Sequence, residues 1–198
     1  MSVNEQSIVE ISMQVNGITV ERAVAPRTLL VDFLREDLGL SGTKVSCELQ
    51  VCGVCTVLVN DRPVSSCTFL AVDADGARVR TVEGLAKGNA LHPLQSAFIA
   101  HHGLQCGFCT PGFMMLAANT LERDPGIGDE ELLDVLSSNL CRCTGYHNIV
   151  AAVRAAQIEM RSKDQAKSTA AAPAAGDTPD PGTATAPELL EQAEIAHE

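Results

Sequence analysis

All eight cysteines of this 198-residue chain fall into two groups of four. The first group has the spacing C-x4-C-x2-C-x11-C, and the second has C-x2-C-x31-C-x-C. Their members are, in order, Cys47, Cys52, Cys55 and Cys67, then Cys106, Cys109, Cys141 and Cys143. Thiolates are strong ligands for zinc and for iron–sulfur clusters. Since no cysteine is left over, each group can supply one complete set of four metal ligands.

The first group has the spacing of the plant-type [2Fe–2S] loop. A tight loop would supply three thiolates, and Cys67 would supply the fourth from a returning strand. Gly53 lies between two of these ligands, where a missing side chain lets backbone N–H groups approach the sulfurs and raise the reduction potential. The alternative is a zinc site, but zinc ribbons use paired C-x2–4-C knuckles that this group does not show.

The spacing of the second group is compatible with either a zinc ion or an iron–sulfur cluster. The C-x-C pair places two sulfurs close together, which suits a cluster without excluding zinc. Cys109 and Cys143 are each followed directly by a predicted helix start. If both helix N-termini face one centre, their free N–H groups and dipoles would stabilise its negative charge. This arrangement favours an iron–sulfur cluster, which becomes more negative when it is reduced.

The first group lies in a region, residues 8–82, whose patterning is mainly that of β-strands. Apolar residues alternate over 9–15, and Asn16-Gly17 then predicts a hairpin turn. A helical period follows over 28–38. Further strands are predicted over residues 56–59, 64–68 and 78–82. A mixed sheet crossed by one helix suits the β-grasp shape of plant ferredoxins, although periodicity alone does not select that shape.

The second group lies in a region, residues 90–160, that reads as four short helices. Pro93 and Thr110 mark the first two starts, Asp129 is the expected cap of the third, and the fourth begins near Tyr146. The apolar positions of the third helix extend to Leu140. Four helices with short loops predict a small bundle. The expected fold is therefore α+β, with a ferredoxin-like domain over 1–83 and a helical domain over 84–161.

The remaining residues, 162–198, form an acidic tail rich in Ala, Pro, Thr and Asp. Such a composition buries too little apolar surface to offset the entropy of ordering, so the tail is predicted to be disordered.

Composition excludes several classes of function. The formal net charge of −11 argues against nucleic-acid binding, which requires a basic face. No apolar run approaches the roughly 20 residues of a membrane helix, and the N-terminus has no signal-peptide pattern. A reducing cytoplasm is therefore expected, where clustered cysteines favour metal over disulfides. No residue is predicted to be catalytic.

Four longer motifs extend these observations to a family. They are Gly42-Thr43-Lys44-x-x-Cys47-Glu48, Cys52-Gly53-x-Cys55-Thr56-Val57, Gln105-Cys106-Gly107-Phe108-Cys109-Thr110-Pro111-Gly112 and Asn139-Leu140-Cys141-Arg142-Cys143-Thr144-Gly145-Tyr146. Over residues 8–160 the chain resembles the small iron–sulfur subunit of molybdenum hydroxylases, the group of xanthine dehydrogenase, aldehyde oxidase and aerobic carbon monoxide dehydrogenase.

The resemblance implies an electron-transfer subunit with one [2Fe–2S] cluster in each cysteine group. It places the helical-domain cluster nearer a molybdenum cofactor and the other nearer a flavin, with Gln105 and Cys143 against the pterin. A large molybdopterin-binding subunit and a medium FAD-binding subunit would complete a heterotrimer, and such complexes can dimerise. Electrons would pass one at a time from molybdenum through both clusters to FAD.

The chain departs from the family at three positions of the first loop. Ser46 and Gln50 stand where glycine is frequent, and Val54 stands where a small residue is usual. The four cysteine ligands are unchanged, but the sequence does not determine the loop conformation or the reduction potential of this cluster. Two other functions remain alternatives: a free two-cluster ferredoxin-like carrier and a zinc-stapled interaction module.

Overall fold

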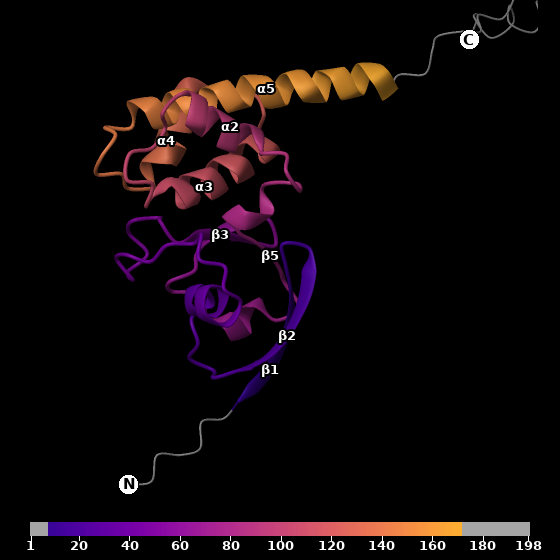
Figure 1. Cartoon of the computed structure of the whole chain (residues 1–198), viewed down its shortest axis with the longest axis vertical. Helices are drawn as coiled ribbons and strands as arrows, with labels where there is room; N and C mark the ends of the chain where they lie inside the picture. The colour runs from indigo at the N-terminus through magenta and orange to yellow at the C-terminus, as the bar shows by residue number, and fades with distance from the viewer. Residues whose placement is uncertain (1–7, 172–198) are drawn as a thin grey trace, which may run out of the picture. The chain divides into compact units, whose positions relative to one another are not determined.

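The computed structural model describes residues 8–171. Its N-terminal part is a five-stranded mixed sheet, of which β1, β2, β3 and β5 are labelled in Figure 1. The strands are β1 (Val9–Val15), β2 (Ile18–Val24), β3 (Thr56–Val59), β4 (Arg62–Ser65) and β5 (Arg78–Arg80). Their order is β2-β1-β5-β3-β4, with β1 and β5 parallel and the other neighbours antiparallel. The predicted mixed sheet is confirmed.

The β1–β2 hairpin turns at the predicted dipeptide. Asn16 and Gly17 both have positive φ, 50° and 87°, which is the conformation that two-residue hairpin loops require. Alternate residues of β1, namely Ile11, Met13 and Val15, are buried in the core beneath the sheet.

One short helix crosses this core. It begins as α1 (Leu30–Asp32) and continues as a π-helical turn, η1 (Phe33–Asp37), in which the Leu38 N–H donates to the Phe33 carbonyl at 3.1 Å. Leu30, Phe33 and Leu34 are fully buried against the sheet. The predicted helix over 28–38 is therefore present but shorter at both ends.

Two 3-10 turns, η2 (Ala71–Ala74) and η3 (Val82–Gly84), flank β5. The strand predicted over 78–82 accordingly ends at Arg80.

Four helices form the second part of the molecule. They are α2 (Pro93–Ala100), α3 (Thr110–Arg123), α4 (Asp129–Ser137) and α5 (His147–Ala171). Pro93 and Thr110 are the first helical residues, as predicted. Within residues 8–171, no helix is long and apolar enough to cross a membrane.

Two details of the third and fourth helices differ from the prediction. The N-cap of α4 is Gly128, and the Asp129 carboxylate pairs with Arg154 on α5 instead of capping its own helix. Leu140 lies beyond the end of α4, because its N–H donates to the Cys52 carbonyl at 2.9 Å.

The prediction that disorder begins at residue 162 is wrong for the first part of the tail, because α5 continues to Ala171. Six of residues 162–171 are Ala, Lys or Gln, which have high helix propensity. Extending an existing helix also avoids the cost of nucleating a new one. The rest of the predicted tail, 172–198, lies outside the described residues, and the domain boundaries stay predictions.

Strand β3 joins the sheet to the helices because both of its faces are buried. Val57 and Val59 belong to the core beneath the sheet, whereas Leu58 packs with Phe98 and Phe113 in the helical core. Helix α3 lies against this strand (Figure 1). The two cysteine-bearing parts therefore share a packed boundary.

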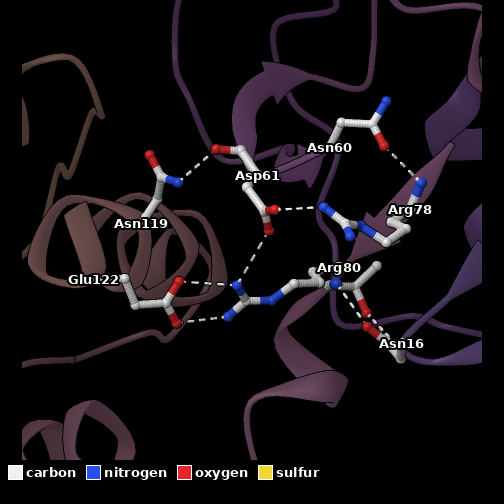
Figure 2. A network of polar contacts seen from close by, with 8 residues as sticks. Asn16, Asn60, Asp61, Arg78, Arg80, Asn119 and Glu122 are labelled. Atoms are coloured by element: carbon white, nitrogen blue, oxygen red, sulfur yellow. Dashed lines mark hydrogen bonds and ion pairs between the residues drawn. The ribbon is translucent and has the colours of Figure 1, made fainter.

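A polar network at the edge of this boundary also connects β5 to α3 (Figure 2). The Arg80 guanidinium binds both carboxylate oxygens of Glu122, at 2.9 and 2.7 Å. The Asn119 amide on α3 donates to the Asp61 carbonyl at 2.8 Å, and Arg78 pairs with the Asp61 carboxylate at 2.8 Å. Bidentate arginine–carboxylate pairs have a narrow geometry, so the network fixes how α3 sits on the sheet.

Candidate metal centres

The loop that carries the first three cysteines curls around the Cys47 sulfur. The backbone N–H groups of Leu49, Val51 and Cys52 all donate to Cys47 Sγ, each at 3.4 Å. Converging N–H groups of this kind form a concave site for a negative charge. They lower the pKa of the Cys47 thiol to about 6. The loop is therefore shaped to hold a thiolate.

The loop conformation explains one departure from the family pattern. Gln50 has a φ of 59°, in the left-handed region that glycine reaches without strain. A glycine at this position would suit the same turn, and the glutamine adopts it under strain. The Gln50 side chain accepts a hydrogen bond from the Thr68 hydroxyl at 3.2 Å, which helps to hold the turn next to the fourth cysteine.

The fourth cysteine of this group is held in a turn and not on a strand. β4 ends at Ser65, so the prediction of a returning strand over 64–68 was wrong at its end. The reason is Ser66, whose hydroxyl and N–H both donate to the Cys55 carbonyl, at 2.7 and 3.3 Å. These bonds pull the chain away from the ladder and place Cys67 beside Cys55. The fully buried Ser66 was missed from the sequence.

The thiols of the first group lie as two contacting pairs. Cys47 interacts with the Cys52 thiol, and Cys67 interacts with the Cys55 thiol. Burial raises the pKa of Cys67 to about 11, and the neighbouring sulfurs contribute to this shift. The loop therefore combines one thiol that ionises easily with one that stays protonated until a metal replaces its proton.

The second group also lies as two pairs. The sulfurs of Cys106 and Cys143 are 3.6 Å apart, and Cys109 interacts with Cys141. Burial raises the pKa of Cys109 to about 12. Contact with Cys106 raises the pKa of Cys143. Cys109 and Cys141, which have 31 residues between them in the sequence, are thus brought together in the fold.

Tyr146 shapes the segment that carries Cys141, a role that the sequence analysis did not identify. Its hydroxyl accepts from the Cys141 N–H at 3.0 Å and donates to the Asn139 carbonyl at 3.3 Å. Its ring packs edge-to-face on Phe113 of α3, with the centroids 6.1 Å apart. The Thr144 hydroxyl lies 3.2 Å from Cys141 Sγ. This is the chain's one tyrosine, a composition signal that could have drawn attention to it.

The helix starts agree in part with the prediction. Cys109 is the N-cap of α3, so free N–H groups at that helix end lie next to a candidate ligand. Helix α5 begins at His147, after a left-handed Tyr146 (φ 68°), and so starts beyond the Cys143-Thr144-Gly145 segment.

The paired arrangement fits a two-iron cluster, in which each iron takes two thiolates. A single zinc ion would instead need four sulfurs around one point. Among residues 8–171, no three His, Cys, Asp or Glu side chains converge as such a single-ion site. The donor chemistry and the pairing both fit [2Fe–2S] clusters.

The two residues predicted to contact a pterin, Gln105 and Cys143, are both exposed, as is Cys106. The second cysteine group therefore opens to the surface on the side of these residues. The first group is more enclosed, because Cys52, Cys55 and Cys67 are buried and Cys47 is partly buried.

Comparisons with known proteins agree with these two centres. A family model described as "2Fe-2S iron-sulfur cluster binding domain" matches residues 13–86, and one described as "[2Fe-2S] binding domain" matches residues 81–154. Together they cover both cysteine groups.

Individual relatives match over most of their length. The caffeine dehydrogenase subunit gamma of Pseudomonas sp. (strain CBB1) is 52% identical over 73% of this chain and 88% of its own. The nicotine 6-hydroxylase small subunit of Paenarthrobacter nicotinovorans is 51% identical over 79% and 94%. A chain in the crystal structure of quinoline 2-oxidoreductase from Pseudomonas putida 86 superposes with a TM-score of 0.76 and 45% identity, covering 80% of this chain and 98% of that one.

The fold, the two sets of paired thiols and these relatives lead to one assignment. The predicted ferredoxin-like domain followed by a helical [2Fe–2S]-binding domain is confirmed. The chain belongs to the family of small iron–sulfur subunits of molybdenum hydroxylases, which serve as electron-transfer subunits of oxidoreductase complexes.

Proposed function

We propose that this chain carries electrons from a molybdopterin centre in a large subunit to FAD in a medium subunit. When bound, the two [2Fe–2S] clusters supply one-electron transfer. Cys47, Cys52, Cys55 and Cys67 hold one cluster, and Cys106, Cys109, Cys141 and Cys143 hold the other. The observation that carries the proposal is that two complete thiol sets lie in two parts of one packed unit.

The surface around each cysteine group supports two separate partner contacts. Leu49 and Val51 on the first loop are 74% and 61% exposed. Phe108 and Leu140 beside the second group are 44% and 49% exposed. Exposed apolar residues clustered around a centre are typical of interaction sites. One partner would cover each centre and exclude water from it.

The chain itself contributes binding and orientation. The N–H groups around Cys47 stabilise its thiolate, Ser66 holds Cys67 beside Cys55, and Tyr146 holds the Cys141 segment against α3. The proposal includes no catalytic residue in this chain. A cytoplasmic location, inferred from cysteine usage, is part of the same proposal.

Metal analysis tests this function directly. The purified chain is expected to be reddish-brown and to contain about four iron and four labile sulfides, because eight thiolates suit two such clusters. It is also expected to co-purify with two larger subunits that contain molybdenum and FAD. Stoichiometric zinc without sulfide would contradict the cluster assignment. A monomer with four iron and no partner would indicate a free carrier instead.

Gln105→Leu is expected to weaken retention of the molybdenum cofactor or to slow reduction of the clusters by substrate. Glutamine has both an amide donor and a carbonyl acceptor, which suit the polar edge of a pterin. Its loss would leave that edge unpaired, at a cost of about 1–3 kcal/mol. Molybdenum occupancy and stopped-flow cluster reduction are the measurements.

Iron content is expected to stay normal in this variant, since Gln105 is not a thiolate ligand. Gln14→Leu is the matched control, because Gln14 is also exposed but lies on β1, away from both cysteine groups. Parental molybdenum occupancy together with parental cluster reduction in Gln105→Leu would remove this residue from the pterin contact.

A further inference from the structure

Four of the eight cysteines are followed directly by a threonine, two in each group. These threonines are Thr56 and Thr68 in the first group, and Thr110 and Thr144 in the second. A threonine hydroxyl has one proton to donate and two lone pairs that can accept. The partners of the four hydroxyls therefore show which of them can still donate to a metal centre.

Both hydroxyls of the first group already have an acceptor in the protein. Thr56 donates to the Gly53 carbonyl at 2.7 Å. Thr68 has two partners at 3.2 Å, the Ser65 carbonyl and the Gln50 side chain. Because each hydroxyl has only one proton, these two serve to hold the first loop and do not donate to a cluster.

The two hydroxyls of the second group differ from each other. The Thr144 hydroxyl lies 3.2 Å from Cys141 Sγ and accepts from the Tyr146 N–H at 3.1 Å. The Thr110 hydroxyl is buried and has no hydrogen-bond partner within residues 8–171. A buried hydroxyl without a partner is destabilising, so an acceptor for this group is expected.

Thr110 cannot use its own helix as that acceptor. A helical threonine hydroxyl normally donates to the carbonyl three or four residues earlier. Thr110 is the first residue of α3, so both of those residues precede the helix. The Gly107 carbonyl accepts from the Thr110 backbone N–H instead, at 3.3 Å. The residue is only 7% exposed, so bulk water does not readily replace the missing acceptor.

The second candidate metal centre lies next to this hydroxyl. Thr110 directly follows Cys109, a buried candidate ligand whose thiol interacts with Cys141. The sulfurs of an iron–sulfur cluster accept hydrogen bonds, and such bonds raise the reduction potential because they favour the more negative reduced form. At the same centre, the Thr144 hydroxyl shows that a threonine can meet a sulfur there.

We propose that the Thr110 hydroxyl donates a hydrogen bond to a sulfur of the second [2Fe–2S] cluster and raises the reduction potential of that cluster. This rests on the proposed function, because it requires a cluster at the second group. The hydroxyl keeps its proton in both oxidation states, and the hydrogen bond is stronger in the reduced state. The threonines of the first group make no equivalent contribution, since their hydroxyls bind the protein itself.

Thr110→Val tests the proposal in the full chain purified in its complex, because valine keeps the branched side chain and removes the hydroxyl. The second cluster is identified by the EPR signal that Cys141→Ser removes. The equilibrium constant for its reduction is expected to fall about tenfold, which is about 59 mV for one electron. Pulsed EPR of the reduced protein in D2O is expected to lose one exchangeable-deuteron coupling from the same signal.

Two further variants serve as controls. Thr110→Ser keeps the hydroxyl and is expected to restore the parental potential and the deuteron coupling. Thr56→Val is the matched control, because Thr56 is also 7% exposed and also follows a candidate ligand, but its hydroxyl binds the Gly53 carbonyl. This control is expected to lower the melting temperature and to leave the potential and deuteron coupling of the second cluster unchanged.

Parental potential and parental coupling in Thr110→Val would overturn the proposal and would assign the hydroxyl to a buried water. A lower melting temperature with no shift in potential would also overturn it, because packing alone would explain that result. Equal shifts in Thr110→Val and Thr110→Ser would do the same, since the hydroxyl would not be their cause. Loss of second-cluster iron from Thr110→Val alone would support the donated bond. Zinc in the parent chain would instead contradict the proposed function.

Discussion

Cys67→Ser is expected to remove the cluster of the ferredoxin-like part and to leave the helical one in place. Serine is a poor replacement for a thiolate ligand of iron. The four thiols of the first group contact one another in two pairs, and the second group supplies its own complete set. The iron content is therefore expected to fall from about four to about two, with loss of one of two EPR signals.

Cys141→Ser is the reciprocal variant and the matched control. It is expected to remove the other EPR signal and to leave the signal that Cys67→Ser loses. Both changes replace one sulfur by oxygen at a candidate ligand, so a general effect of the substitution would appear equally in both. Loss of both signals from either variant would contradict two independent centres.

Gly53→Ala is expected to destabilise the chain strongly and to impair binding of the first cluster. The φ of Gly53 is 70°, where a residue with a side chain such as alanine is strained by about 1–2 kcal/mol. In addition, the new Cβ would strike the Asn139 side chain and lie 3.0 Å from its Cα. Overpacking of this kind costs about 1–3 kcal/mol. The free energy of unfolding and the iron content are the measurements.

Gly76→Ala separates the two effects of that change. Gly76 has the same φ, 70°, but a Cβ there meets no atom within 4 Å. This control is expected to lose only the strain energy, about 1–2 kcal/mol, and to keep both clusters. If the two variants lost equal stability, the contact between Gly53 and Asn139 would not matter.

The pattern of apolar residues predicted most of the secondary structure. The Asn16-Gly17 hairpin and the helix starts at Pro93 and Thr110 follow from local rules of turn geometry and periodicity. The predicted first and last residues of helices and strands were less accurate, because they depend on contacts with other segments. β4 ends early where Ser66 binds the Cys55 carbonyl, and Asp129 turns to Arg154 instead of capping α4.

The prediction for residues 162–198 failed for a different reason, because part of this segment is helical where disorder was expected. Its composition was averaged over 37 residues, from 162 to 198, and Pro, Gly and Asp in the later part outweighed the Ala, Lys and Gln of 162–171. Those earlier residues extend α5, because they follow an existing helix and have high helix propensity.

The sequence by itself determined the number of centres, the type of ligand and the family. Thiolate chemistry depends on residue type, and loop spacing limits which cysteines can reach one metal cluster. Tertiary structure alone decided which cysteines of the second group pair, because Cys106 meets Cys143 only after distant segments pack together. It also decided why Gly112 must lack a side chain. That reason is the carbonyl of Gly53, an atom of the opposite subdomain that no local pattern around Gly112 could reveal.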